Sequence, residues 1–493
     1  MNLKKSFIKN NIHVLAANIF IYLSGIFLTP LVIKTSGEGT YGQYVLIISV
    51  LGVIYGLSSL GVGHKARRLI ASENQPEKRA ELFYPPFIFQ FSISLVIGLL
   101  LILFLPFFNR WFFEDSLGVK GIYLLIYLLL YFLYSQSVDF FRNTHRMGNF
   151  STATLFQPYA HIGISLFIYF YTGSLDVRKL LYSQVISFFI IGSFFMFMLV
   201  REIGFKPKFP QINVLKYEIA FGLPIVFGYI VDQILAISDR YVIAGFFSVN
   251  SVAYYTVAYS LGSLPVFFAK VSGVVLPPIL SLQVDNDNQE EGEKMVNATI
   301  KGYLLLTIPY IFGCAILGYP ILELYANSST AREGHIIMPV VAFGIVFYGL
   351  SLILMNVLFV SMKTRDMFSG NLTAAVLNLG LNFLFIPLIG NIIVAAVTTV
   401  FSYLVLFGFI YYKLRKIWNM KIDKSFILKV IGSSVMMFAF LSIMLNGESN
   451  VSLTVERLVG LMFGGFGVYG IFILIFQAVD LREIITMLEI SRK

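Results

Sequence analysis

Repeated apolar runs of about 20 residues or more constrain the fold of this chain most strongly. Each run is long enough to cross the hydrocarbon core of a bilayer as a helix. The runs do not show the short alternating segments of a membrane β-barrel, and in lipid a helix satisfies its own backbone hydrogen bonds. Only 13% of the residues are charged, against about 25% in soluble domains. The pattern predicts an all-α polytopic membrane protein.

The apolar runs divide into fourteen predicted spans. They cover residues 11–34, 41–63, 82–108, 119–141, 149–173, 180–200, 219–247, 251–282, 298–325, 335–362, 367–389, 391–412, 425–446 and 455–478. With the N-terminus in the cytoplasm, most of the 36 Lys and Arg residues fall on the inner side. This bias follows the positive-inside rule and predicts that both termini are cytoplasmic. It also accounts for the net charge of +10 without a nucleic-acid partner.

Two pairs of segments indicate an internal repeat. HIGISLFIYFYTG (161–173) resembles NLGLNFLFIPLIG (378–390), and YGQYVLIISVLG (41–52) resembles VAYYTVAYSLGS (252–263). Both matches shift by six spans. An even shift preserves orientation, so the repeats are predicted to be parallel, with the substrate path between them.

The repeat defines the predicted domains. They are an N-lobe at 1–200 (spans 1–6), a basic cytoplasmic linker at 201–218, a C-lobe at 219–415 (spans 7–12), and two additional spans with a cytoplasmic tail at 416–493. The loops between spans are short, so any function is expected within the helices.

Charged residues inside the predicted spans are the first site candidates. Asp232, Asp239 and Arg240 lie in DQILAISDRYVIAGFF (232–247), and Lys270 lies deep in the next span. A charge inside a membrane helix is costly, so it usually faces a partner or a water-filled cavity. Asp232 and Asp239 are two turns apart and are candidates for ion coupling. Arg240, Lys270 and Asp239 are candidates for the substrate cavity, where cations suit a phosphate. Snorkelling or purely structural ion pairing is the alternative.

Uncharged polar residues give weaker candidates. His161 is a candidate proton site, and Asn378 and Asn382 share one helix face, where they could hydrogen-bond sugars. Each could instead hydrogen-bond a neighbouring helix. The sequence contains no Walker A motif, metal-ligand spacing or nucleophile elbow. We therefore expect no catalytic residues, no metal and no cofactor, and a protein that is not an enzyme.

Three stretches together resemble a known superfamily: GEGTYGQY (37–44), the segment at 221–263, and NLGLNFLFIPLIG (378–390). They resemble the multidrug/oligosaccharidyl-lipid/polysaccharide exporter superfamily, and within it the polysaccharide transporter branch with the Wzx-type O-antigen flippases. The resemblance implies a flippase for an undecaprenyl-diphosphate-linked oligosaccharide in the bacterial inner membrane. It also implies alternating access, a proton or sodium gradient as the driving force, and other polysaccharide assembly proteins as partners.

Three other functions are consistent with parts of the sequence. A multidrug antiporter of the same fold fits Asp232 and Asp239, but the two additional spans and the excess of basic residues disfavour it. A lipid II flippase also has fourteen spans and a basic cavity, and the few cationic residues in the first-lobe helices weaken that match. A membrane glycan polymerase is disfavoured because the outer loops are short.

Overall fold

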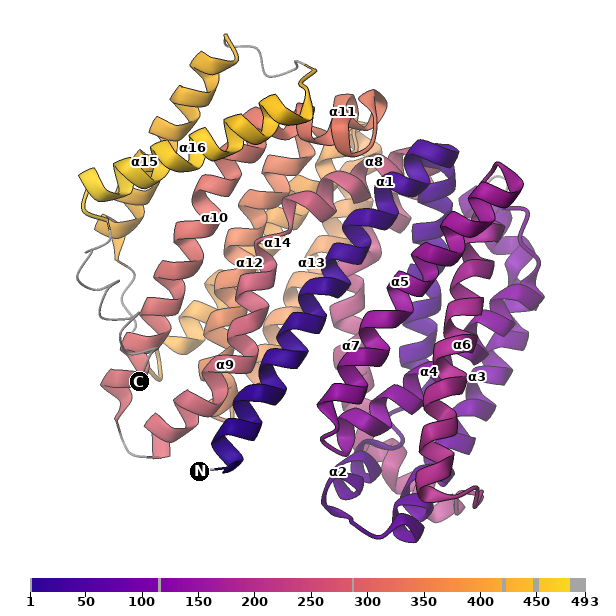
Figure 1. Ribbon diagram of the computed structural model, residues 1–493. Coiled ribbons are helices and arrows are strands. Elements are labelled where there is room, and N and C mark those ends of the chain that lie inside the picture. The colour runs from indigo at the N-terminus through magenta and orange to yellow at the C-terminus, as the bar shows by residue number, and fades with distance from the viewer. Residues whose placement is uncertain (1, 114–116, 286–287, 419–422, 447–451, 479–493) are drawn as a thin grey trace. The chain divides into compact units, whose positions relative to one another are not determined.

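The computed structural model describes residues 2–113, 117–285, 288–418, 423–446 and 452–478, with side chains from residue 20 onward except residues 22 and 285. The predicted cytoplasmic tail beyond residue 478 lies outside the described residues. The helices, shown in Figure 1, are α1 (Asn2–Ser58), α2 (His64–Ser72), α3 (Pro76–Phe113), α4 (Gly121–Asn143), α5 (Met147–Thr172), α6 (Val177–Ile203), α7 (Ile212–Phe246), α8 (Val249–Gly262), α9 (Val266–Asp285), α10 (Gln289–Tyr325), α11 (Ser328–Gly334), α12 (Ile337–Val360), α13 (Thr364–Ile389), α14 (Ile393–Leu414), α15 (Lys424–Met444) and α16 (Val455–Ile475).

The prediction of an all-α polytopic membrane protein is confirmed. Twelve helices in the described residues are long and apolar enough to cross a membrane. The first of them, α1, joins two of the predicted spans through a kink at Gly37, which has φ 82° and ψ 171°. The predicted span 251–282 is instead two helices, α8 and α9. The break between them contains Pro265, which has no backbone N–H to continue a helix.

The chain divides into two compact units. Unit 1 comprises Met1–Ile237 and Phe247–Asn250, and unit 2 comprises Ser238–Phe246 and Ser251–Lys493. The helix α7 contributes to both, because its first part packs in unit 1 and its last part in unit 2. The lobe boundaries predicted from the sequence stay a prediction.

Corresponding helices pack in the same order in the two units. In unit 1, α4 packs against α3 and α6, and α5 packs against α6; in unit 2, α12 packs against α10 and α14, and α13 packs against α14. Gly173 ends α5 with φ 68°, and Gly390 ends α13 with φ 69°. A left-handed residue at a helix end strongly favours glycine. The predicted parallel repeats are thus confirmed, including the Gly173–Gly390 match.

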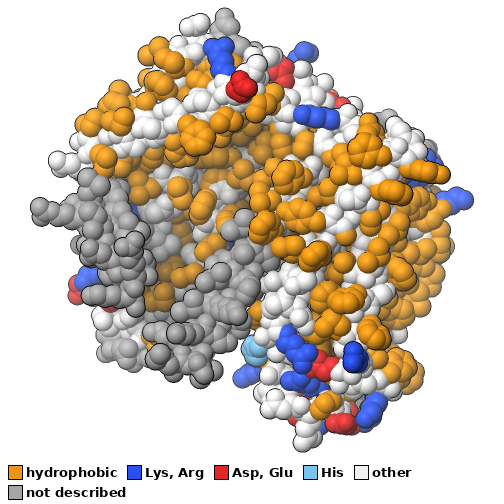
Figure 2. Space-filling model, in the orientation of Figure 1, with side chains coloured by type: hydrophobic (Ala, Val, Ile, Leu, Met, Phe, Trp, Pro, Cys, Tyr) orange, Lys and Arg blue, Asp and Glu red, His pale blue; other side chains and the backbone are white. Residues whose placement is uncertain are grey.

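The outer surfaces of the helices are apolar. Phe170 is 80% exposed, and Phe104 and Phe197 are also exposed. Figure 2 shows hydrophobic side chains along the visible sides of the helices and charged side chains mostly near their ends. Such extensive apolar exposure is typical of lipid-facing surface and not of a soluble protein. The buried positions include many Ser, Thr and Asn residues, which supply hydrogen bonds between helices in lipid.

Candidate functional site

A buried carboxylate lies where α7 meets α8 in unit 2. Asp239 is 4% exposed, and its carboxylate accepts a hydrogen bond from the Tyr255 hydroxyl. The backbone N–H of Arg240 donates to the same carboxylate at 2.9 Å. A buried carboxylate is tolerated only where donors compensate for lost hydration, and these two supply part of that compensation.

A chain of polar side chains continues from α7 into α13 and α14. Ser238 donates to Asn378 at 3.4 Å, and Asn378 donates to the Thr399 hydroxyl at 3.1 Å. Asn382 donates to Asn378 at 3.3 Å and accepts from the Thr398 hydroxyl. The oxygens of Asn378, Asn382, Thr398 and Thr399 therefore form one buried polar cluster, which we call the unit 2 cluster.

The unit 2 cluster also reaches the carboxylate. Ser238, which donates to Asn378, immediately precedes Asp239 on α7, and the Tyr255 hydroxyl donates to the Asp239 carboxylate. A further contact joins α8 and α14: the hydroxyls of Tyr259 and Tyr403 lie 3.0 Å apart. The sequence singled out Asp239, Asn378 and Asn382, and the structure brings these three into one hydrogen-bonded region. The tyrosines and threonines carried no sequence signal, because such residues are common in apolar helices.

The other predicted charges lie elsewhere. Asp232 is exposed and lies in the part of α7 that belongs to unit 1. Asp239 is buried and lies in the part of α7 that belongs to unit 2. Arg240 is half-buried in unit 2. His161 lies on α5 in unit 1 and is 3% exposed.

Lys270 lines a cavity in unit 2. The cavity has a volume of about 330 Å³ and is formed by α9, α12 and the start of α13. Lys270 and Phe359 are exposed, and the buried Asn356 donates to the Ser272 hydroxyl at 3.2 Å beside it. A lysine in an open cavity can bind an anion that enters from outside.

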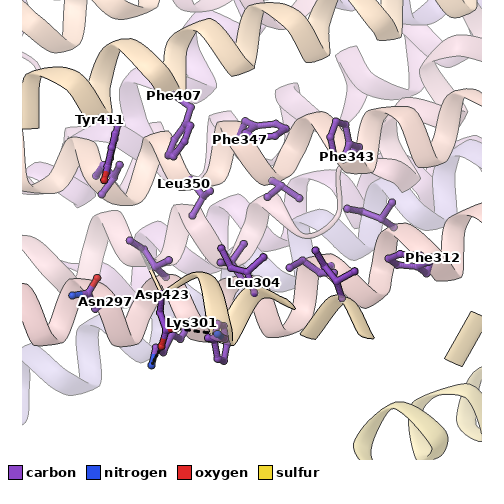
Figure 3. Close-up of a pocket in the computed structure, with 18 residues that line it drawn as sticks. Asn297, Lys301, Leu304, Phe312, Phe343, Phe347, Leu350, Phe407, Tyr411 and Asp423 are labelled. Carbon is purple, nitrogen blue, oxygen red and sulfur yellow. Dashed lines mark hydrogen bonds and ion pairs between the residues drawn. The ribbon is translucent and has the colours of Figure 1, made fainter. Parts of the chain in front are cut away.

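A larger apolar groove lies between α10, α12, α14 and α15, and we call it the α10–α15 groove. Its volume is about 630 Å³. Figure 3 shows its long apolar wall, with Phe312 and Phe343 at one end. The other end is polar: Lys301 forms an ion pair with Asp423 at 3.0 Å. The shape suits a long apolar chain with a polar end.

The helix α12 separates the groove from the Lys270 cavity. Leu350 and Leu354 line the groove, whereas Met355 and Asn356 line the cavity. Residues 354 and 356 point about 200° apart on a helix, so the two spaces lie on opposite sides of α12. Sequence reasoning missed the groove, because side chains that line an apolar groove have the same composition as side chains that face lipid.

Comparison with known proteins identifies the family. The sequence model of the family described as "Lipid II flippase MurJ" matches residues 69–462, which is most of the chain. The chain belongs to this family. Family membership makes it a transporter of the flippase class, with a lipid-linked substrate.

Two solved structures and one curated protein extend the comparison. A lipid II flippase MurJ in an inward closed conformation has a TM-score of 0.75 and 20% identity, covering 95% of this chain and 99% of that one. An inward-facing multidrug resistance MATE transporter of the MOP superfamily has a TM-score of 0.59 and 16% identity, covering 81% and 96%. At these identities the likeness shows a shared fold. An uncharacterized membrane protein of Methanocaldococcus jannaschii is 24% identical over 81% of each chain.

The expected assignment to the Wzx-type O-antigen branch is wrong. The family match is to the lipid II flippases, and the first of the similar structures described above is also a lipid II flippase. The two additional spans and the repeat do not separate the branches, because both features are expected of either one. The few cationic residues in the first-lobe helices do not exclude the lipid II flippase family.

Proposed function

We propose that this protein moves a polyprenyl-diphosphate-linked saccharide of the lipid II class across a bacterial plasma membrane. The α10–α15 groove carries the proposal, because a drug-sized substrate has no need of a long apolar channel beside its binding site. A lipid-linked substrate has three chemically different parts: an apolar tail, an anionic diphosphate and a polar saccharide. Unit 2 offers a matching surface for the first two.

The tail would lie in the α10–α15 groove. Ligand sites commonly measure about 300–1,000 Å³, so a volume of about 630 Å³ is sufficient for part of a polyprenyl chain. The groove exists because α15, from the first of the two additional spans, packs against α10. This gives the additional helices a function that a twelve-helix transporter does not require.

The diphosphate would bind Lys270. Lys270 is an exposed residue that lines an open cavity, where a phosphate could approach its ammonium. Charge-assisted hydrogen bonds to phosphate are roughly twice as strong as neutral ones. Because α12 alone separates the cavity from the groove, a single substrate could place its head on one side of that helix and its tail on the other.

Ion coupling would use Asp239 and the unit 2 cluster. Asp239, Asn378, Asn382 and Thr398 offer carboxylate, amide and hydroxyl oxygens, which are the ligands of hard cations. Sodium fits this donor set. Asp239 now accepts from Tyr255, so binding sodium would require a local rearrangement of that hydroxyl.

The experiment that tests the function is transport in proteoliposomes. The full chain is reconstituted with fluorescent lipid II, and an enzyme outside the vesicles reports how much saccharide has become accessible. Sodium and proton gradients are imposed separately. Protein-dependent exposure that rises with a gradient is expected. Exposure no faster than in protein-free vesicles, with folded protein, would overturn the proposal; efflux of a cationic dye by the same vesicles would favour the drug antiporter.

A further inference from the structure

Unit 1 contains a second buried polar cluster, on α1, α5 and α6. The Ser165 and Ser183 hydroxyls lie 2.7 Å apart, and the Tyr44 hydroxyl donates to Gln184 at 2.8 Å. His161 lies one turn before Ser165 on α5, with its ring centroid 6.0 Å from that of Tyr44. All five residues belong to unit 1.

This cluster is the repeat counterpart of the unit 2 cluster. The two sequence alignments pair His161 with Asn378, Ser165 with Asn382, and Tyr44 with Tyr255. The bonding agrees with the alignment, because Ser165 and Asn382 each bond the first member of a consecutive polar pair on the following helix. Those pairs are Ser183–Gln184 on α6 and Thr398–Thr399 on α14. In unit 1, the second member, Gln184, accepts from the Tyr44 hydroxyl.

One of the differences between the two clusters adds a titratable ring to unit 1. Where unit 2 has the Asn378 amide, unit 1 has the His161 imidazole, and none of the five residues in the unit 1 cluster is a carboxylate. Carboxylate and amide oxygens suit a hard cation. Imidazole binds a proton between about pH 5 and pH 8. We propose that His161 is a proton-binding site, so that the repeat holds a proton site in unit 1 and a metal-cation site in unit 2.

The groups around His161 couple its protonation to the packing of the surrounding helices. Its Nε2 atom is buried and has no hydrogen-bond partner among the described residues. The titratable neighbour is the Tyr44 phenol on α1, and the groups beside Tyr44 are also phenols, Tyr41 on α1 and Tyr127 on α4. On α6, the neighbouring group is the Leu180 carbonyl. These groups are uncharged at neutral pH, so a buried imidazolium would lack an anionic partner among the described residues. His161 therefore takes up its proton when α1, α5 and α6 separate enough to admit water. A protonated ring then opposes their return to close packing.

The proton-binding site is tested directly by NMR. The full chain in lipid nanodiscs is labelled with ¹⁵N-histidine, and H161N identifies the His161 signal by its loss. H335N is the matched control, because His335 belongs to unit 2 and its ring contacts the Ala331 and Arg332 carbonyls. As the pH is lowered from about 8 to about 4, we expect the His161 signal to change from neutral to protonated, with faster hydrogen exchange of the α5 amides near it.

Two results would overturn the inference. One is a His161 ring that stays neutral across the whole range. The other is protonation that leaves hydrogen exchange in α5 unchanged, since an imidazole already in contact with water needs no opening. If H161N does not fold, H161Q serves in its place. Only the role of the proton in transport rests on the proposed function. If His161 titrates but the protein moves no lipid II, the proposed function is wrong and the proton site stands. If the protein transports lipid II while His161 stays neutral, the proton site is wrong and the proposed function stands.

Discussion

The Nζ atom of Lys301 lies 3.0 Å from Oδ2 of Asp423, at the polar end of the α10–α15 groove. Asp423 also caps α15, because its carboxylate accepts from the Phe426 N–H at 2.9 Å. One carboxylate thus starts the additional helix and ties it to α10. The groove depends on both interactions, since α15 forms one of its walls.

The first prediction concerns the pH dependence of this contact. The Phe426 N–H and then the Lys301 ammonium hold the pKa of Asp423 below its ordinary value of 3.8. Stability from the ionised carboxylate is therefore complete above that ordinary value and is lost as the pH falls through the lower, folded value. D423N should keep the cap and lose the ion pair, lowering stability by about 0.2–1 kcal/mol. D423A should cost about 1 kcal/mol more. Thermal unfolding of purified protein across pH provides the measurement, and a D423N deficit that persists unchanged in acid would contradict it.

The second prediction tests the groove as the place of the tail. Leu350→Trp adds a large side chain to the groove wall and should slow lipid II transport at least tenfold while the protein still folds. Filling a cavity strains the packing by no more than about 1–3 kcal/mol. Leu404→Trp is the control, because Leu404 is a 43% exposed residue of α14 outside the groove lining. Proteoliposome transport, with unfolding temperature measured alongside, decides the matter. Equal transport by both variants would place the tail elsewhere.

The third prediction concerns Lys270 as the diphosphate contact. Lys270→Ala should reduce transport roughly tenfold, because it removes the charge that binds the diphosphate. A tenfold change corresponds to about 1.4 kcal/mol of binding free energy. Lys270→Arg should retain most activity, because the positive charge remains. Lys363→Ala removes an exposed lysine at the N-cap of α13 and serves as the control. Concentration dependence should show weaker substrate binding in the alanine variant. An arginine variant as defective as alanine would argue for packing and against charge.

The fourth prediction addresses sodium at the unit 2 cluster. A ligand that binds the folded state raises its unfolding temperature, so NaCl should stabilise the wild type more than KCl at equal ionic strength. Asn382→Ala should abolish this difference and destabilise the protein by about 0.5–1.5 kcal/mol for each of the hydrogen bonds that Asn382 makes with Asn378 and Thr398. Asn356→Ala, at another buried asparagine, should keep the sodium effect. A sodium effect that survives in Asn382→Ala would exclude this site.

The fifth prediction tests a close backbone contact in unit 1. A Cβ at Gly222 on α7 would lie 2.1 Å from the Gly61 carbonyl oxygen, and Gly61 itself has φ +75°. Gly222→Ala should force the two segments apart and increase hydrogen exchange around residues 57–63. Gly228→Ala, on the same helix, meets nothing within 4 Å and should leave exchange unchanged. Similar exchange in both variants would show that the backbones approach less closely in the membrane.

Much of the architecture was predicted from the sequence, and particular residues show which features were not. Gly173 and Gly390 revealed the repeat because a left-handed helix end strongly favours glycine in both copies. One span was predicted over residues 251–282, whereas the structure has two helices, α8 and α9, with Pro265 in the break between them. Asp232 and Asp239 looked equivalent because both lie on one face of α7, yet one is exposed and the other buried.

By itself, the sequence determined that the chain spans a membrane as helices, in two parallel repeats with two further helices. These properties depend on apolar length, loop charge and short-range periodicity, all of which are local. Only the tertiary structure decided which polar side chains meet, as Asp239 meets Tyr255 and Lys301 meets Asp423. It also decided where the groove lies. An apolar side chain has the same character whether it faces lipid, core or groove, and only the packing of its neighbours distinguishes the three.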